Sequence, residues 1–417
     1  MLKKEVAKLE DKDRSQLRDY FLAWEYAGPN SNLPPIRAEF KSLKEKRQAL
    51  EKEFPATMIS KELPQPRPAW VLTRGQYDKH GEAVSPGVPA VLPPLPAAEA
   101  TNRLTFARWL VEPRHPLTAR VAVNRLWQQF FGIGLVKTAE DFGTRGEWPS
   151  HPELLDWLAT EFVRTGWDVK QMVRLLVTSA TYRQDSRVGP KLHELDPENR
   201  LLARGPRYRL DAEALRDYAL NAGGLLNLKM GGRGVRVYQP PGIWEAVGYT
   251  SSDTAKYTQD HGEALYRRSL YVFWKRTAAP PVMTTFDAPS REQCRARRER
   301  TNTPLQALLL MNDPQYFEAA RHLGYRMLRE GGADDTERLR YGFRLATDRQ
   351  PRPEECAILA ESLKAQRERY QADEAAARKV ISVGESPVPV DVAPSELAAY
   401  AMVANLLLNL DEVVTKN

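Results

Sequence analysis

Cysteine is almost absent from this sequence, with two residues among 417, Cys294 and Cys356. They stand far apart and form neither a CxxC nor a CxxCH motif, so a zinc knuckle, a disulfide framework and a covalent haem site are not expected. Long apolar runs are also lacking, and none approaches the roughly 20 residues that cross a bilayer. The opening stretch "MLKKEVAKLEDKDRSQLRDY" lacks the apolar core of a signal peptide. We therefore expect no membrane span and no export signal in this chain.

Motifs of familiar catalytic sites are missing as well. The six histidines include no pair separated by three or four residues and no HExxH motif. The stretch "GGRGVRVYQPPG" departs from the GxxxxGK[ST] order of a phosphate-binding loop, and no GxSxG marks a nucleophile. We predict no metal in this chain; only a site assembled from distant residues stays open.

The residues that are present describe a globular protein. A hydrophobic content of 42% over 417 residues is enough to bury a sizeable core and to build two or three domains. Lys and Arg total 61 against 54 for Asp and Glu, which gives a net charge of +7. This modest excess permits attraction to polyanions but identifies no partner.

The first 100 residues divide into two segments of different composition. Residues 1–54 predict a charged helical hairpin, because apolar residues recur at helical spacing around Trp24 and around Phe40, on either side of the breaker "GPNSNLPP". We expect the apolar stripe that includes Phe40 to pack on a neighbour. Residues 55–100 contain nine prolines, a composition that no long helix tolerates, and predict an ordered strap or linker with one short strand at 69–74.

Residues 101–417 predict a helical domain with a small sheet near 231–275. Helix start signals recur in this region: Ser150, Asp168 and Thr303 each stand in a capping position before an apolar-periodic stretch. The closing stretch "PSELAAYAMVANLLLNLDEVV" predicts a last apolar helix docked into the bundle. The fold class that we predict is mainly α: a helical bundle with a small β element and an N-terminal helical hairpin.

The stretch "FDAPSREQCRARRERTNTPLQALLLMNDP" places five arginines against two glutamates between Arg291 and Arg300. Three hypotheses compete: a basic patch for a nucleic acid or an acidic glycan, a clamp on an anionic substrate, and arginines that pair with internal carboxylates. If the segment is helical, Arg291, Arg295 and Arg298 share one face. The purer basic face and the fold signatures of nucleic-acid-binding domains are missing, so a nucleic acid is not expected.

We favour the structural hypothesis, because the helix start at Thr303 follows the arginines directly and fixes them to the fold. Arginine's planar fork suits pairing with carboxylates. We predict that at least two of Arg291, Arg295, Arg298 and Arg300 pair with carboxylates from elsewhere in the chain. The first candidate partners are Asp287 and the acids of 211–217.

Two polar clusters are candidates for acid/base chemistry. In the first, a helix N-terminus gathers polar side chains where unpaired amides and the helix dipole converge: Glu140, Asp141, His151 and Glu153. In the second, the loop "GIWEAVGYTSSDTAKYTQDHGE" interleaves aromatics with polar residues that suit carbohydrate work: Asp253, Asp260 and His261. A solvated cap and an ordered surface loop remain the plainer interpretations of the two clusters.

Several long stretches, among them "VNRLWQQFFGIGLVKTAEDFGTRGEWPSHPELLDWLATEF" and "NRLLARGPRYRLDAEALRD", carry a family resemblance together with the arginine stretch. From about Ala69 to its last residues the sequence closely resembles the DUF1553 (PSD1) family, which is abundant in planctomycetes. Members usually form the C-terminal part of exported proteins that carry a signal peptide, a DUF1549 domain and often a planctomycete-type cytochrome c domain. This sequence lacks those upstream parts and resembles a C-terminal portion, a truncated reading frame or a stand-alone version.

The resemblance implies a cytochrome c or DUF1549-type domain as partner, haem only on that linked or partner cytochrome, and a place in the periplasm or cell envelope. Our leading hypothesis is a non-catalytic accessory or binding module of such an exported, cytochrome-linked protein. The alternative is an enzyme acting on a sulfated or otherwise acidic polysaccharide, with the arginines holding the substrate and Asp253, Asp260 or Glu140 doing acid/base work. A deep cleft that joins arginines to two carboxylates would favour the enzyme.

Overall fold

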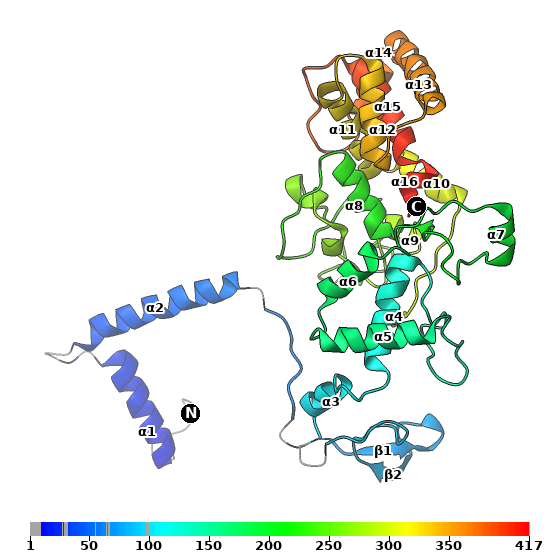
Figure 1. Cartoon of the computed structure of the whole chain (residues 1–417). Coiled ribbons are helices and arrows are strands. Elements are labelled where there is room, and N and C mark those ends of the chain that lie inside the picture. The colour runs from blue at the N-terminus through cyan, green and yellow to red at the C-terminus, as the bar shows by residue number, and fades with distance from the viewer. Residues whose placement is uncertain are drawn as a thin grey trace. The chain divides into compact units, whose positions relative to one another are not determined.

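The computed structural model describes residues 10–26, 28, 32–54, 56–63, 65, 67–96, 101–249 and 251–416. Contacts divide the chain into two units, Met1–Pro86 and Gly87–Asn417. Helices hold 51% of the structure and strands 5%, so the predicted mainly α class is confirmed (Figure 1). Within the described residues no helix is both long and apolar enough to cross a membrane. Residues 1–9, the start of the stretch examined for a signal peptide, and residues 97–100 of the predicted strap lie outside the described part.

The first unit contains two helices whose apolar residues stay exposed. They are α1 (Asp11–Tyr20), continued by the π-helical turn η2 (Phe21–Glu25), and α2 (Leu33–Glu53). The rings of Trp24 and Phe40 lie 5.8 Å apart, and Arg37 donates to the carbonyl oxygens of Leu22 and Trp24. Phe40 is nevertheless 53% exposed and Leu50 54%, so the stripe finds no covering partner among the described residues of this unit. Part of the predicted breaker, residues 29–31, lies outside the described residues.

The strand predicted at 69–74 is present but has a partner that the sequence did not reveal. Strand β1 (Ala69–Leu72) pairs antiparallel with β2 (His80–Val84). The turn between them begins with the short 3-10 helix η3 (Thr73–Gly75), in which Arg74 and Gly75 both adopt positive φ. The indole of Trp70 stacks on the ring of His80 with centroids 4.2 Å apart. This stacking fixes the register across the bulged pair.

Besides a small cluster around Ile381 and Leu397, the described residues of the second unit form two larger hydrophobic cores, and Figure 1 shows the helices that surround these two. The smaller core lies among α4, α5 and α6 and is centred on residues such as Val123, Leu158 and Met172. The helices of this part are α3 (Arg103–Leu110), α4 (Thr118–Phe131), α5 (Pro152–Arg164), α6 (Val169–Thr178) and α7 (Pro190–Leu195). Asp168 caps α6 by accepting a hydrogen bond from the backbone N–H of Gln171, as predicted.

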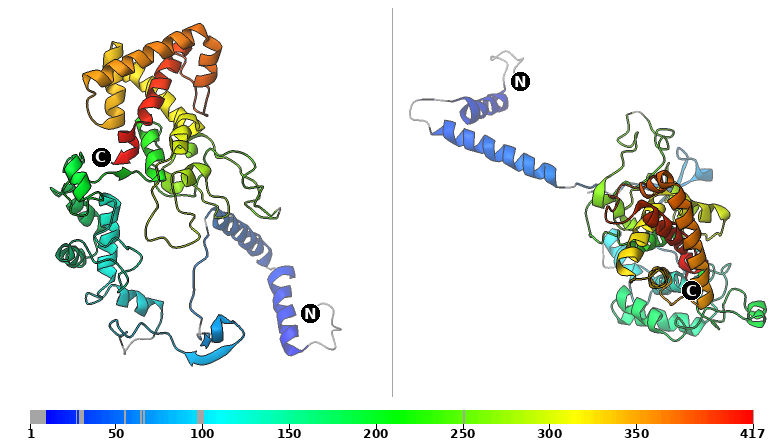
Figure 2. Two further views of the ribbon diagram at one scale, coloured as in Figure 1. Left: turned by 90° about the vertical axis from the view of Figure 1, so that its right-hand side faces the viewer. Right: turned by 90° about the horizontal axis from the view of Figure 1, so that it is seen from above.

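The larger core is built around the closing apolar helix, which is almost wholly buried as predicted. Gly324 allows this packing, because a Cβ there would lie 2.7 Å from the backbone nitrogen of Ala401. In Figure 2 the orange and red helices of this bundle lie together in both views. The helices of the bundle are α8 (Ala212–Ala222), α9 (Pro281–Thr285), α10 (Pro304–Asn312), α11 (Pro314–Glu330), α12 (Asp335–Thr347), α13 (Pro353–Ala372), α14 (Glu374–Ile381), α15 (Pro394–Leu408) and α16 (Asp411–Val414).

The small sheet predicted near 231–275 is not formed, and that prediction is wrong. Among its described residues, 231–249 and 251–275, this region contains the 3-10 turns η4 (Gly262–Tyr266) and η5 (Ser269–Tyr271) and only isolated bridges, such as Val235 with Val272. Pro240 and Pro241 lack the N–H groups that a ladder needs, so the chain leaves the extended conformation there. The strands of this unit are instead β3 (Tyr208–Arg209) and β4 (Thr415–Lys416), which pair antiparallel.

Hydrogen bonds from arginine side chains take the place of strand-to-strand hydrogen bonds in this irregular region. The guanidinium of Arg267, which is 8% exposed, donates to the carbonyl oxygens of Lys229, Gly231 and Arg233. Arg216 on α8 is 1% exposed and donates to the carbonyl oxygens of Leu265 and Arg267. Leu265 and Arg267 are buried residues whose carbonyl groups must be paired, and here the side chain of Arg216 pairs them. The irregular segment is thus held in place by two arginine side chains, Arg267 of the segment itself and Arg216 of α8.

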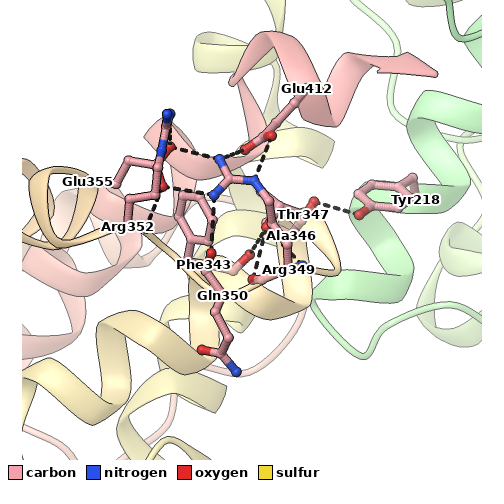
Figure 3. A network of polar contacts seen from close by, with 9 residues as sticks. All are labelled: Tyr218, Phe343, Ala346, Thr347, Arg349, Gln350, Arg352, Glu355 and Glu412. Atoms are coloured by element: carbon pink, nitrogen blue, oxygen red, sulfur yellow. Dashed lines mark hydrogen bonds and ion pairs between the residues drawn. The ribbon is translucent and has the colours of Figure 1, made fainter. Parts of the chain in front are cut away.

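A second arginine joins distant elements of the bundle, as Figure 3 shows. Arg349, in the loop after α12, donates to both carboxylate oxygens of Glu355 on α13, at 2.7 and 2.8 Å. It also donates to both oxygens of Glu412 on α16, at 2.8 and 3.0 Å. These bidentate pairs hold the pKa of Glu355 well below its usual range, with Arg352 as a further donor. The result is a charged clamp that fixes α16 and hence strand β4.

Candidate functional site

The arginine segment, residues 291–300, lies in the loop between α9 and α10 and is not helical. The conditional prediction of one shared helical face for its arginines therefore does not apply. The loop is closed at its base, because Asp287 accepts hydrogen bonds from the backbone N–H and the hydroxyl of Thr301. Thr303 then forms the predicted capping box with Gln306 at the start of α10. Both ends of the segment are thus attached to the fold.

The prediction that the segment's arginines pair with carboxylates elsewhere in the chain is confirmed. Arg298 lies 2.6 Å from Glu213 and 3.7 Å from Asp211, both at the start of α8. Arg300 lies 3.7 Å from Asp211, and Arg291 lies 3.9 Å from Glu213. The acids of 211–217 are therefore the partners. Asp287 is not among them, because its carboxylate is taken up by Thr301.

These ion pairs are partly buried, and burial and the partner's charge shift the pKa values of their side chains in opposite directions. Burial raises the pKa of Glu213, but the hydrogen bond and charge of Arg298 outweigh it, so the net shift is downward. Burial lowers the pKa of Arg298, and the same pair with Glu213 reverses this, so its net shift is upward. Asp211 is the N-cap of α8 but makes no capping hydrogen bond with its side chain, which faces Arg298 and Arg300 instead. The start of α8 therefore serves as the base for the segment.

Arg300 also joins the segment to the end of α4. Its guanidinium lies over the ring of Tyr208 at 4.3 Å and donates to the carbonyl oxygen of Gly132. Gly132 ends α4 with φ of 86°, and a Cβ there would lie 2.8 Å from the ring of Tyr208. Burial raises the pKa of Tyr208 to about 12, so its phenol stays neutral beneath the cation. A turn, a strand and the arginine segment meet at this point.

Three arginines of the segment are exposed: Arg291, whose side chain is 43% exposed and lies over the ring of Trp274, and Arg295 and Arg297, which both line one cavity. Arg297 has one weak contact, 3.7 Å from Glu140, with its side chain 48% exposed. Arg295 is exposed and has no carboxylate within ion-pair distance among the residues that the structure describes. Arg298 and Arg300, by contrast, are 34% and 21% exposed in their side chains. The segment thus divides into anchored and outward-facing arginines.

Two adjoining cavities, here called the arginine site, share Arg297, Arg298 and Arg300 in their walls. The smaller cavity holds about 180 Å³, and five arginines line it against one carboxylate, Asp211. The larger cavity holds about 480 Å³ and adds Arg204 and Arg207, the latter paired with Asp411, together with one acid, Glu198. Glu198 is itself paired with Lys137 at 2.8 Å. Such convergence of guanidinium groups on a concave surface suits an anion, because each fork can bind two oxygens of a sulfate or carboxylate.

The sequence predictions did not single out two residues of the arginine site. Arg125 lies on α4, which we had treated only as a core helix, and His193 lies on α7. Arg125 follows the buried Val123 and Asn124 and is exposed, so its position on the outer helix face was the available signal. Two further arginines, Arg200 and Arg204, hold loops of the fold together. Arg200 donates to the carbonyl oxygens of Gly134 and Leu135, and Arg204 to those of Asp196 and Pro197.

The first polar cluster lies in the turn before α5 and is only loosely gathered. His151, and not Ser150, is the N-cap of α5, and no side chain caps it, so the predicted capping box is wrong. Ser150 instead donates its backbone N–H to the carbonyl oxygen of Leu135, which draws it away from the helix. Asp141 accepts from the backbone N–H of Gly143, and Glu153 is exposed in the first turn. Glu140, Asp141, His151 and Glu153 do not line the arginine site.

The second polar cluster is distributed among separate contacts. Asp260 accepts from Arg233 and from the backbone N–H of Arg236, while His261 lies 2.8 Å from Glu385. Asp253 is exposed in a turn. None of the three lines the arginine site. Trp244 of the same loop is 1% exposed and so cannot present its ring to a ligand.

The described residues contain no group of three or more His, Cys, Asp or Glu side chains that could hold a metal ion. The sequence model of the PSD1 family, described as "Protein of unknown function (DUF1553)", matches residues 102–363, which include the arginine site and both polar clusters. Neither the curated proteins nor the solved structures contain a match to this chain.

Proposed function

Because the chain belongs to the PSD1 (DUF1553) family, we propose that it is an accessory binding module of an exported, cytochrome-linked protein and that it binds an acidic polysaccharide at the arginine site. One observation carries the proposal: five arginines against a single carboxylate in the smaller cavity. Guanidinium forks recognise sulfate and carboxylate groups in a bidentate manner, and repeated anionic groups along a polymer can engage several forks at once.

The arrangement beneath the cavity supports binding. Asp211, Glu213 and Tyr208 hold Arg298 and Arg300 in place before any ligand arrives. Groups that are already fixed lose less conformational entropy on binding. Arg295 and Arg297, which face outward, then supply cations whose charge is little compensated within the protein.

The positions of the carboxylates favour a binding module over the enzyme. General acid/base catalysis on a glycosidic bond needs two carboxyl groups that flank the bound sugar. Asp253, Asp260 and Glu140 lie outside the walls of both arginine cavities. The acids that do line them, Asp211 and Glu198, are paired with Arg298 and Lys137.

Calorimetric titration of the protein with heparin, as a defined sulfated polysaccharide, tests the binding. We expect the double variant Arg295→Ala, Arg297→Ala to bind at least about tenfold more weakly, with an unchanged melting temperature. The matched control Arg378→Ala, Lys379→Ala removes two exposed charges from α14 and should bind as the wild type does. An equal loss in both variants would indicate nonspecific charge attraction, and release of reducing ends from heparin would support the enzyme instead.

The link to a cytochrome rests on the family resemblance alone and needs its own test. Affinity purification of the tagged chain from a host that encodes it should co-purify a protein that stains for covalent haem. The same purification with an unrelated tagged protein is the control. Enrichment of partners without haem would argue against this part of the proposal.

A further inference from the structure

A third cavity, of about 590 Å³, lies against the turn that leads into α5 and has a different character. Its wall is largely apolar and includes Phe142 and Leu155, and its rim carries Trp148. Trp148 is 88% exposed, although burying an indole ring is among the largest apolar gains available to a side chain. Neither polar cluster contributes its candidate residues to this wall.

The turn that carries Trp148 is firmly braced. The hydroxyl of Thr138 donates to the carbonyl oxygen of Asp141 and accepts from the backbone N–H of Glu147. A Cβ at Gly146 would lie 2.2 Å from the carbonyl oxygen of Asp141, so the close turn depends on glycine at this position. The indole is therefore exposed on a fixed backbone and needs little ordering to receive a ligand.

The charged groups of the cavity differ from those of the arginine site. One cation, Arg120, lies 2.7 Å from Asp156, and Glu147 adds a second carboxylate. The hydrogen bond from Arg120 lowers the pKa of Asp156 and keeps this side chain an ionised acceptor at neutral pH. With two carboxylates to one guanidinium, the cavity disfavours an anion. It offers hydrogen-bond donors and acceptors beside an apolar wall.

We propose that this cavity binds an uncharged pyranose ring, with the indole of Trp148 stacked on the apolar C–H face of the sugar. Asp156 and Glu147 accept hydrogen bonds from sugar hydroxyls, and Arg120 donates to them. A hydroxyl-rich ligand uses both kinds of group, whereas a purely apolar ligand would displace water from these charged groups without replacing its hydrogen bonds. The proposal deepens the proposed function and rests on it for the choice of a polysaccharide as ligand.

The cavity and the arginine site are connected by one ion pair and by a short stretch of chain. Glu140, in the same turn as Trp148, lies 3.7 Å from Arg297 of the arginine segment. Gly132 and Ile133 line the larger arginine cavity, while Val136, three residues further on, lines the cavity of Trp148. One polysaccharide chain can therefore present its acidic groups to the arginines and a neutral ring to the indole.

Calorimetric titration with neutral hexasaccharides, namely cellohexaose, mannohexaose and xylohexaose, tests the proposal without involving the arginine site. We expect at least one of them to bind the wild-type chain, and Trp148→Ala to weaken that binding at least about tenfold. Trp148→Phe keeps an aromatic face and should lose less. The matched control is Trp157→Ala on α5, because Trp157 is 52% exposed and does not line the cavity. The melting temperature of each variant confirms that it folds.

Each outcome bears on the proposal. Binding of none of the three sugars by the wild type, or undiminished binding by Trp148→Ala, would overturn it. So would a dimer in sedimentation that dissociates in Trp148→Ala, since the indole would then cover a second copy. Loss of heparin binding only in the double variant Arg295→Ala, Arg297→Ala, with neutral sugar binding intact, separates the two sites. If the protein binds a neutral sugar through Trp148 but does not bind heparin, the arginine site is refuted and the sugar site at Trp148 is supported.

Discussion

The bundle and the arginine segment use the same residue type in opposite ways. In the bundle, Arg216 and Arg321 are each 1% exposed and direct their guanidinium groups at carbonyl oxygens of irregular loops. In the segment, Arg295 and Arg297 are exposed, and the charge of neither is closely matched by a carboxylate. A count of arginines therefore does not identify a polyanion-binding surface. What identifies it is the fraction of guanidinium groups left without acceptors inside the fold.

The largest effect should come from removing a buried fork. Arg216→Ala leaves the carbonyl oxygens of Leu265 and Arg267 without their donor, so we expect a loss of roughly 3 to 5 kcal/mol in the free energy of unfolding. Urea unfolding followed by circular dichroism measures it. Arg378→Ala, which removes an exposed partner of Glu374, is the matched control and should change stability by about 0 to 1 kcal/mol. Equal effects in the two variants would contradict the comparison.

The clamp of Figure 3 should give the next largest effect. Arg349→Ala removes bidentate contacts with Glu355 and Glu412, and since these groups are partly exposed we expect a loss of about 2 kcal/mol. Arg349→Lys keeps the charge but not the fork, and it should recover only part of this loss. Full recovery by lysine, measured in the same urea experiment, would show that charge alone matters here.

Anchored arginines of the segment should show an intermediate effect. Arg298→Ala and Arg300→Ala break part-buried pairs with Glu213 and Asp211, and we expect each to cost about 1 to 2 kcal/mol. Retention on heparin should weaken as well, because both side chains line the arginine site. The measurements are thermal unfolding and salt elution from a heparin column. Unchanged melting with lost retention would show that these two side chains serve binding and do not stabilise the fold.

The smallest difference concerns pH. The pKa of Glu355 is lowered in the folded state, so its contribution to stability is present above its unfolded pKa and is lost as the pH falls toward the folded value. The wild type should therefore lose more stability than Arg349→Ala between pH 6 and pH 3. Parallel stability curves for the two proteins over this range would rule out the clamp as the source of acid sensitivity.

Local chemistry could be predicted from the sequence better than contacts between distant segments, although the capping box predicted at Ser150 is not formed. The cap of Asp168, the capping box at Thr303 and the buried closing helix depend on neighbouring residues, and the structure confirms all three. The sheet expected near 231–275 has the right β-branched composition. It does not form because Pro240 and Pro241 interrupt it and Arg267 satisfies its carbonyl groups instead.

The arginine site was half predictable for the same reason. The acids of 211–217 could be named in advance as candidate partners of the segment because the planar fork of arginine suits pairing with carboxylates. The division between Arg298 and Arg295 could not, since it depends on how a non-helical loop turns over the start of α8. Trp148 carried no signal either. Its neighbours in sequence are those of an ordinary turn, and only the folded structure leaves the indole exposed.

The pairing of β3 with β4 has a consequence for the order in which the molecule is completed. Tyr208, which lies under Arg300, belongs to a strand whose partner, Thr415–Lys416, follows about 200 residues later. At roughly 5 to 20 residues per second, the ribosome needs on the order of 10 to 40 s to supply that partner. During this interval the floor of the arginine site lacks its neighbouring strand. The surface proposed to bind polysaccharide is thus among the last parts of the molecule to mature, after the α4 to α6 core has had time to assemble.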